Sequence, residues 1–405
     1  MIVAGGTYHE HVAFGGQTRE LGGSAYRAAV AVPSATKLVT AVEDDLAPIL
    51  AGAGKTFSVE VENVRRDKSV EFGYLAEFIE PTIRGADARL LGELHVEAQA
   101  ALAFGIVEAG DRSFDVGALV YDPQSADDRA IEILQHASFK RAILCGNALE
   151  IVSIAQGGSI DRSAHLILEQ CNLEAVVVKC GARGCLIVEK ESQEWIGAVP
   201  SQTVRKLGSG DIFSATFAHA WTSGAGTVDA ARIASHSTSW WTSSHADQIP
   251  AEVLDGGLSA SSERLELSNH GRSPKVYLAG PFFTVAELWL VSQCRTFLQQ
   301  AGAEVFSPVH DIGLGGAEVA EKDLIGLAGV DAVFAILDGW DPGTLFETGW
   351  AKHAEIPIVG VASQLDSIRT TMLAGTGAEL HTDFTTGMYR AIWRGLGVGG
   401  TDGVK

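Results

Sequence analysis

The sequence lacks the patterns on which disulfide-rich and metal-binding proteins depend. Its 405 residues include five cysteines, an odd number, and no two of them form a C-x-x-C pair. We therefore expect free, buried thiols in a reducing compartment. The twelve histidines contain no H-x-x-x-H pattern, which argues against a structural zinc site.

Positive charge is also scarce. Thirty Lys and Arg residues face 50 Asp and Glu residues, so the formal net charge is −20. This balance argues against electrostatic binding of nucleic acid or of a membrane, although backbone amides can still bind small anions. The N-terminus has no basic region followed by a long apolar run, and no window reaches about 18 uninterrupted apolar residues. We expect a cytoplasmic protein that spans no membrane.

Glycine, by contrast, is abundant. Forty-six glycines separate runs rich in Val, Ile and Ala, which is typical of α/β proteins with many tight turns. The length is sufficient for two or three domains. In the N-terminal part the pattern predicts helices at 24–32 and, more weakly, at 93–105, and strands at 2–4, 37–42, 57–64, 70–79, 116–121, 141–145, 173–179 and 184–189.

Residues 254–273 are polar, rich in Ser and Gly and poor in aromatics, which indicates a linker. Beyond it, strands and helical stretches alternate clearly. The predicted helices include 286–300, and the predicted strands are 275–279, 303–307, 331–337, 356–362 and 378–382. Five strands joined by crossovers predict a compact doubly wound domain with a parallel sheet.

A first candidate site lies where a glycine turn enters a predicted helix, at Gly208, Ser209, Gly210 and Asp211. Successive backbone N–H groups can hold the charge on a transferred phosphoryl group, and Asp211 can deprotonate a substrate hydroxyl. A glycine turn with Asp211 as the helix cap explains the same residues without any chemistry.

Weaker features accompany this turn. Asn147 and Glu150 lie one helical turn apart, which suits an outer-shell Mg²⁺–phosphate network, although Asn147 can equally cap a helix. Glycines in two further loops leave room for a polar ligand or a flat base: Gly22, Gly23, Gly181 and Gly184.

In this order, residues 1–250 resemble the ribokinase-like sugar and nucleoside kinases of the PfkB family. The segment GSGDIFSATF is close to the family signature G-A-G-D-x-F, and Asn147-x-x-Glu150 matches its N-x-x-E motif. The resemblance implies ATP and Mg²⁺ as cofactors and Asp211 as the base. It implies an anion hole and further cofactor-binding residues at Gly208, Ser209, Gly210, Asn147, Glu150, Gly181 and Gly184, and acceptor-binding residues at Gly22, Gly23 and Glu10.

The chain departs from the family pattern around the acceptor. Arg205 and Lys206 stand where the family usually has Asp-Thr, and Arg27 stands where an Asn usually follows the Gly-Gly pair. Glu10 replaces the early sugar-binding Asp. The acceptor therefore stays open, and a kinase fold kept only for binding or assembly is the alternative.

A second candidate site is the stretch DGWDPGTLFETGW at 338–350. It follows the predicted strand 331–337 and opens a predicted helix, 345–354, so it lies where open α/β sheets bind ligands. Its acids are Asp341 and Glu347. Thr344 can cap the helix, and the helix dipole would then favour an ionised Glu347, which suits a nucleophile. T-x-x-E is also a capping box, so Glu347 can have a purely structural role.

Two further side chains are expected to converge on this acidic stretch. Tyr277 ends the first strand of the doubly wound domain, next to the strand that precedes the stretch, and Asp323 lies on a predicted helix. One tyrosine and several carboxylates, with neither metal nor cysteine, suit glycosyl transfer. One carboxylate attacks the anomeric carbon, and other acids serve the departing nucleobase.

Residues 274–398 resemble the nucleoside 2-deoxyribosyltransferases. VYLAGPFF, FSPVHDIG, EKDL, DAVFAILDGWDPGTLFETGWA and DFTTGMYRAIW fit that family in order. The resemblance implies Glu347 as nucleophile, Tyr277 as its hydrogen-bonding partner, and Asp323 and Asp341 as acids that contact the base. It implies no cofactor, and substrate-binding roles for Gly280, Pro281, Gly343 and Met372.

The family is oligomeric and completes each pocket from a neighbouring subunit, so we expect a homo-oligomer. The contributing segment usually reads Asn-x-Met; here Thr370 replaces the Asn while Met372 fits. This departure concerns recognition of the sugar 5′ group.

The sequence as a whole predicts a cytoplasmic nucleoside salvage enzyme that acts on nucleosides, nucleobases and sugars. Its expected domains are a ribokinase-like α/β/α sandwich at 1–253, a linker at 254–273, and a flavodoxin-like domain with five parallel strands at 274–405. The alternatives are an N-glycoside hydrolase of nucleosides or nucleotides, and a regulatory module that only senses nucleotides.

Overall fold

The computed structural model describes residues 1–14, 18–125, 129–244, 246–256, 271–313 and 315–399. The chain folds into two compact units. The N-terminal unit comprises Met1–Cys180, Gly184–Val199 and Arg205–Ser262, and the C-terminal unit comprises Gly181–Arg183, Pro200–Val204 and Glu263–Lys405. Most of the predicted linker, residues 257–270, lies outside the described residues.

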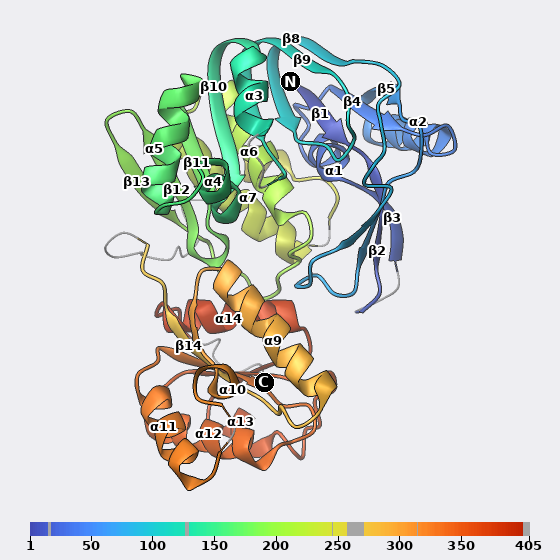
Figure 1. The fold of residues 1–405 in the computed structure, drawn as a ribbon. Coiled ribbons are helices and arrows are strands. Elements are labelled where there is room, and N and C mark those ends of the chain that lie inside the picture. The colour runs from blue at the N-terminus through green and yellow to red at the C-terminus, as the bar shows by residue number, and fades with distance from the viewer. Residues whose placement is uncertain (15–17, 126–128, 245, 257–270, 314, 400–405) are drawn as a thin grey trace. The chain divides into compact units, whose positions relative to one another are not determined.

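The N-terminal unit is built on a nine-stranded sheet (Figure 1). Seven neighbouring strands are parallel, and two antiparallel strands complete one edge. From that edge the order is β13 (Gln193–Gly197), β12 (Gly184–Glu189), β11 (Ala175–Lys179), β10 (Ser138–Asn147), β9 (Arg112–Asp122), β8 (Leu94–Phe104), β1 (Ile2–Gly6), β4 (Lys37–Val42) and β5 (Glu60–Arg65). The hairpin predicted around Gly181 is the antiparallel pair β11–β12.

Helices cover both faces of this sheet, because its central strands bury apolar side chains on both sides. One core joins the sheet to α1 (Ser24–Ala31), α2 (Ala47–Phe57), α6 (Ser209–Thr222), α7 (Thr227–Ser244) and α8 (Ala251–Leu254). The other core joins it to α3 (Arg129–His136), α4 (Ala148–Ile154) and α5 (Ile160–Cys171) (Figure 1). The predicted α/β/α sandwich is confirmed.

A small second sheet accompanies the large one. Its order is β3 (Thr18–Gly22), β2 (Tyr8–Val12), β6 (Glu71–Tyr74) and β7 (Thr82–Arg84). A buried network connects β2 to the main sheet, since Tyr8 Oη donates to Glu108 at 2.9 Å and Arg66 donates to the same carboxylate at 2.8 Å. Arg66 and Glu108 are fully buried as an ion pair.

The predicted helix at 93–105 is wrong, because these residues form β8. Leu94 and Val96 are buried while His95 and Glu97 are exposed, which is the period-two pattern of a strand. The Ala-rich end of β8 pairs with β1 and β9 in the middle of the sheet. Burial on both faces there overrides the helix propensity of alanine.

The C-terminal unit contains a five-stranded sheet, all parallel, as predicted. The order is β15 (Glu304–Phe306), β14 (Lys275–Ala279), β16 (Ala332–Ile336), β17 (Ile358–Val361) and β18 (Glu379–His381). This is the flavodoxin-like order 2-1-3-4-5, in which successive strands are added first to one side of β14 and then to the other, so that the switch point lies between β14 and β16.

The helices of this unit follow its strands (Figure 1). Next to the sheet, α9 (Val285–Gln300) contacts α14 (Phe384–Gly395), and α11 (Ala317–Ala328) contacts α12 (Pro342–His353). The shorter helices are α10 (Pro308–Asp311) and α13 (Thr371–Gly375). No helix in the described part of the chain combines the length and apolar character needed to cross a bilayer.

Candidate functional site

The centre of the C-terminal site is a hydrogen bond between two residues 70 positions apart. Tyr277 Oη donates to Glu347 Oε1 at 2.7 Å. Tyr277 stands on β14, which pairs with β16, and Glu347 stands on α12, the helix that follows β16. The tyrosine is fully buried, and its ring stacks on Phe306 with the centroids 5.5 Å apart. Sheet topology therefore brings together the two residues that the sequence paired.

The pKa of Glu347 is raised to about 7: burial is the largest cause and repulsion from Asp323 and Asp341 adds to it, whereas the hydrogen bond from Tyr277 lowers it. Burial, followed by the charge of Glu347, also raises the pKa of Tyr277. The phenol thus stays protonated and donates. The carboxyl group changes charge near neutral pH.

The start of α12 differs from the prediction. Asp341 is the N-cap and accepts from the Thr344 N–H at 2.7 Å and from its hydroxyl at 3.0 Å. The proposed cap at Thr344 is wrong, and so is the capping box with Glu347. Because α12 begins at Pro342, Glu347 lies in its second turn, beyond the main reach of the helix dipole.

Asp323 supplies a second acid with free hydrogen-bonding capacity. Its Oδ1 is buried and has no hydrogen-bond partner among the described residues. Burial raises its pKa, and its charge acts on both Tyr277 and Glu347. A buried, unpartnered carboxyl oxygen can accept from, or donate to, a ligand.

The predicted substrate-binding residues occupy three places. Gly280 and Pro281 follow β14, and Pro281 lines a cavity of about 160 Å³ together with Ile336, Asp338 and Gly339. The others lie in helices: Gly343 in the first turn of α12, and Met372, 74% exposed, on α13.

Asp338 was not predicted as a site residue. Its carboxylate accepts from the backbone N–H of Ser363 at 3.0 Å and from the hydroxyl at 2.9 Å. It therefore ties the loop after β16 to the loop after β17. The position of Asp338 directly after a buried strand is the sequence signal that could have identified it.

In the N-terminal unit, Gly208 is the N-cap of α6, with φ at +86°, a conformation that favours glycine. Ser209 and Gly210 are the first residues of the helix. The Ser209 N–H donates to Lys206 O at 3.0 Å, whereas the N–H groups of Gly210 and Asp211 have no backbone acceptor among the described residues. Asp211 lies in the first turn and is not the cap, so that alternative is wrong. The turn has the backbone geometry of an anion hole.

Asp211 does not stand alone. Arg27 Nη1 donates to Asp211 Oδ2 at 2.5 Å, and Arg27 Nη2 donates to Glu10 Oε2. The side chains of all three are at most 14% exposed. Glu10 Oε1 also accepts from the Gly23 N–H at 2.9 Å. The sequence marked Arg27 only as a departure from a family pattern, and nothing in the spacing predicted this contact across 184 residues.

The glycines beside this triad are required by close packing. A Cβ on Gly22 would lie 2.4 Å from Cδ of Glu10, and Gly23 has φ at +94° with Gly6 O only 2.6 Å from where its Cβ would stand. At both positions the missing side chain lets the backbone lie close to other groups of the protein, whereas the sequence predicted the approach of a ligand.

Behind the glycine turn lies a second charged network, which was not predicted from the sequence. Lys179 Nζ donates to Asp122 at 2.5 Å and to Ser214 at 3.2 Å. The same Nζ lies 3.7 Å from where a Cβ on Gly210 would stand. A buried ammonium thus stands beside the anion hole.

Asn147 and Glu150 form a capping box at the start of α4. The Asn147 side chain accepts from the Glu150 N–H at 2.9 Å, and the Glu150 side chain accepts from the Asn147 N–H at 2.7 Å. The cap alternative is confirmed for Asn147. Burial, followed by the charge of Asp122, raises the pKa of Glu150 to about 7.

Gly181 and Gly184 take different places. Gly181, with φ at +58°, begins the short 3-10 helix η1 (Gly181–Arg183), which is part of the C-terminal unit. Gly184, with φ at +102°, begins β12 and packs against Ile196 O. Within the described ranges, no three His, Cys, Asp or Glu side chains are grouped so that they could hold a metal ion.

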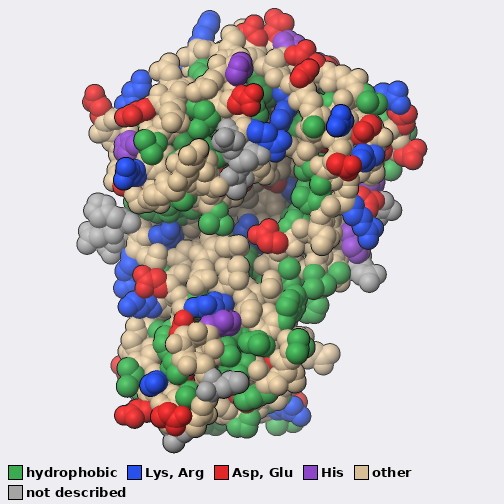
Figure 2. Space-filling model, viewed as in Figure 1, with side chains coloured by type: hydrophobic (Ala, Val, Ile, Leu, Met, Phe, Trp, Pro, Cys, Tyr) green, Lys and Arg blue, Asp and Glu red, His purple; other side chains and the backbone are tan. Residues whose placement is uncertain are grey.

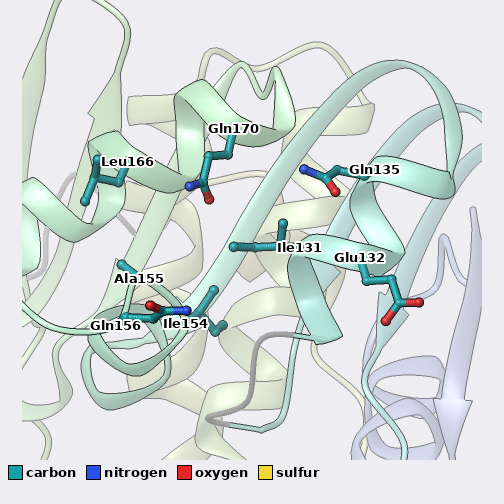
Figure 3. A pocket seen from close by; sticks show the side chains of 8 residues that line it. All are labelled: Ile131, Glu132, Gln135, Ile154, Ala155, Gln156, Leu166 and Gln170. Atoms are coloured by element: carbon teal, nitrogen blue, oxygen red, sulfur yellow. The ribbon is translucent and has the colours of Figure 1, made fainter.

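A larger cavity, of about 470 Å³, contains none of the predicted site residues. It lies among α3, α4 and α5 and is open to solvent (Figure 3). In Figure 3 the amides of Gln135 and Gln170 point toward its interior. The rest of its wall is formed by Glu132 and Gln156 and by the apolar side chains of Ile131, Ile154, Ala155 and Leu166.

Comparison with known families agrees with the two-part resemblance. The profile of the pfkB family carbohydrate kinases matches residues 97–254, and that of the nucleoside 2-deoxyribosyltransferases matches residues 276–388. Both are families of enzymes, which supports an enzyme of nucleoside metabolism. A comparison with curated protein sequences gives no match.

Solved structures establish the fold of the N-terminal unit. A probable sugar kinase from Rhizobium etli CFN 42 is 14% identical with a TM-score of 0.51, and the match covers 64% of this chain and 98% of that one. The adenosine kinase from Sinorhizobium meliloti is 14% identical with a TM-score of 0.50, covering 64% and 99%. At such identities the likeness shows the ribokinase fold alone.

Proposed function

We propose that the C-terminal unit transfers 2-deoxyribose between nucleobases through a covalent intermediate on Glu347. The observation that carries this proposal is the Tyr277–Glu347 hydrogen bond beside the unpartnered buried oxygen of Asp323. The bond orients one carboxylate oxygen and leaves the other for attack. The match to the deoxyribosyltransferase profile supports the substrate class.

In the proposed reaction, an oxygen of ionised Glu347 forms a bond to C1′ of a 2′-deoxynucleoside. The C1′–N bond breaks, and its electron pair leaves with the base, which Asp323 or Asp341 protonates. A nitrogen of a second base then forms a bond to C1′ and gives its proton to the same aspartate, while the bond from C1′ to Glu347 breaks and its electron pair returns Glu347 to a free carboxylate. With a pKa near 7, Glu347 is half ionised at neutral pH.

We also propose that the chain forms a homo-oligomer through the C-terminal unit. Large apolar side chains are exposed there, among them Phe346 at 64%, Ile368 at 84% and Met372 at 74%. Apolar side chains also gather on the face of this unit seen in Figure 2. Apolar surface of this kind typically marks a protein interface. Light scattering on wild type and Ile368→Asp tests it: a monomeric wild type sinks this proposal.

For the N-terminal unit we propose phosphorylation of a sugar or nucleoside hydroxyl. ATP would supply the γ-phosphoryl group, with Mg²⁺ to offset its charge. The residues present fit a phosphate: Gly210 and Asp211 offer N–H groups at a helix start, and Lys179 offers a cation beside Gly210. Glu150 and Asn147 would contact the hydration shell of Mg²⁺, and Asp211 would take the proton of the acceptor hydroxyl.

Product analysis tests the proposal directly. The full chain is incubated with a deoxynucleoside and a different free base, with and without Mg-ATP. We expect an exchanged nucleoside, which Glu347→Ala abolishes and which Glu304→Gln, an exposed acid on β15, leaves unchanged. Free deoxyribose without any exchanged nucleoside would identify a hydrolase instead. ATP turnover that depends on Asp211 is the outcome expected of the N-terminal unit.

A further inference from the structure

The guanidinium of Arg27 binds the carboxylate of Asp211, the proposed base, which must be free to take a proton from the acceptor. It bridges Asp211 and Glu10, and it lies against the glycine turn: a Cβ on Gly208 would stand 2.2 Å from Cδ and 2.3 Å from Nε of Arg27. Positive charge therefore lies at the mouth of the anion hole.

The carboxylates of this triad have little capacity left for a neutral acceptor. Glu10 accepts from Gly23 with one oxygen and from Arg27 with the other. Asp211 accepts from Arg27 with one oxygen and from Gln124 Nε2, at 3.3 Å, with the other. A neutral hydroxyl would have to replace the cationic guanidinium as donor, and so exchange an ion-paired hydrogen bond for one from an uncharged donor.

A further basic residue, Lys206, belongs to the glycine turn. The backbone N–H of Lys206 donates to Glu77 at 2.6 Å, but its ammonium forms no hydrogen bond or ion pair within the described residues. Lys206 precedes Gly208, the N-cap of α6, by two residues, and its carbonyl accepts from the Ser209 N–H at 3.0 Å, so its backbone is part of the glycine turn. The charges of Asp211 and Lys179 act on its ammonium. Burial lowers its pKa, and an anionic ligand would counter that effect.

We propose that the acceptor of the N-terminal unit is a phosphomonoester, a sugar phosphate or nucleoside monophosphate, held by Arg27 and Lys206. The inference rests on the proposed kinase function and narrows its substrate class. A phosphate dianion offers several acceptor oxygens to the planar guanidinium and to the ammonium. When Arg27 turns to that phosphate, it releases Asp211, so only an anionic acceptor exposes the base.

The phosphoryl transfer then needs no reactant beyond the acceptor and Mg-ATP. Asp211 takes the proton of the acceptor hydroxyl, whose oxygen forms a bond to the γ-phosphorus of ATP. The bond from that phosphorus to the β–γ bridging oxygen breaks, and ADP leaves with the electron pair. Asp211 afterwards returns its proton to solvent.

Matched ligand pairs test this proposal. Calorimetry without ATP compares 2-deoxyribose with 2-deoxyribose 5-phosphate, and a deoxynucleoside with its 5′-monophosphate. We expect one phosphorylated ligand to bind at least about 100-fold more tightly than its neutral partner, and its kcat/KM with Mg-ATP to show the same preference. Arg27→Gln should reduce both ratios to about 10-fold or less, whereas Arg232→Gln, which removes a half-exposed surface ion pair, should leave them unchanged.

The outcomes separate this inference from the kinase proposal. Equal binding of neutral and phosphorylated ligands, or a ratio that Arg27→Gln leaves unchanged, overturns the phosphomonoester site. If phosphorylated ligands bind in an Arg27-dependent way but no ATP is turned over, the phosphomonoester site is supported and the kinase proposal is refuted. If Arg27→Gln does not fold, Lys206→Gln provides the second variant, because it removes an ammonium that forms no ion pair within the described residues; an unchanged ratio there overturns the proposal too.

Discussion

Replacing Tyr277 with Phe removes only the hydroxyl that donates to Glu347. A hydrogen bond to a charged group is worth about 1.5–3 kcal/mol, and one pKa unit corresponds to about 1.36 kcal/mol. The hydroxyl lowers the pKa of Glu347, which burial holds near 7. Without it, the pKa of Glu347 should rise by about 1–2 units, to between about 8 and 9.

The assay is the pH profile of kcat/KM for base release from a deoxynucleoside, measured from about pH 5 to 10. Because the nucleophile must be ionised, the acid limb of wild type should lie near pH 7, and that of Tyr277→Phe should lie about 1–2 units higher. At pH 7, where wild type is half ionised, the variant should lose about 5- to 50-fold, and it should recover most of that loss at about pH 10.

Thermal unfolding provides the control for this variant. The ring of Tyr277 stacks on Phe306, and phenylalanine preserves that contact. At about pH 5, where Glu347 is protonated in both folded proteins, the unfolding temperature should therefore change much less than at about pH 9. A stable variant whose activity falls equally at every pH would refute the reasoning. Such a result would mean that the hydroxyl orients Glu347 without setting its charge.

Three further predictions concern stability. Burial raises the pKa of Glu347 to about 7, so between pH 4.5 and 7 the folded chain keeps a proton that the unfolded chain has lost. The resulting loss of folding stability grows over this pH range and reaches about 3 kcal/mol above pH 7. Glu347→Gln should therefore stabilise the C-terminal unit at about pH 8 but not at about pH 4, which denaturant unfolding can measure. Asp341→Asn should retain the α12 cap and lose activity, whereas Asp341→Ala should also lose about 1 kcal/mol of stability. Glu108→Ala should destabilise the N-terminal unit by about 3 kcal/mol or more, because the buried Arg66 loses a partner; a loss below about 1 kcal/mol would contradict this.

The sequence predicts strands well where burial is continuous. The predictions 37–42, 184–189 and 275–279 coincide with β4, β12 and β14. It predicts poorly where the signal is non-local. The small sheet of the N-terminal unit was not predicted as a sheet, because β2 and β6 are mixed in polarity and pair in parallel across about 60 residues of chain.

The two candidate sites differ in the same way. Tyr277 and Glu347 could be paired from the sequence, because adjacent parallel strands end at one edge of a sheet. Arg27 and Asp211 could not, because α1 and α6 carry no local signal of their contact. A sequence motif identifies the catalytic residue type, here Asp211. Tertiary packing determines which side chain binds it, here Arg27, and so whether its carboxylate is free to react.

That difference determines what each acid can do. Glu347 is buried near other acids, and the hydrogen bond that it accepts comes from a neutral phenol, so its proton is held near neutral pH. Asp211 has a guanidinium within hydrogen-bonding distance, so its charge is matched before any ligand arrives. A carboxyl group such as Glu347 can change its charge near neutral pH, as the proposed bond formation at C1′ requires. A carboxyl group such as Asp211 becomes a base only after another anion has taken its cation, and the charge of the acceptor therefore decides whether the N-terminal unit can react.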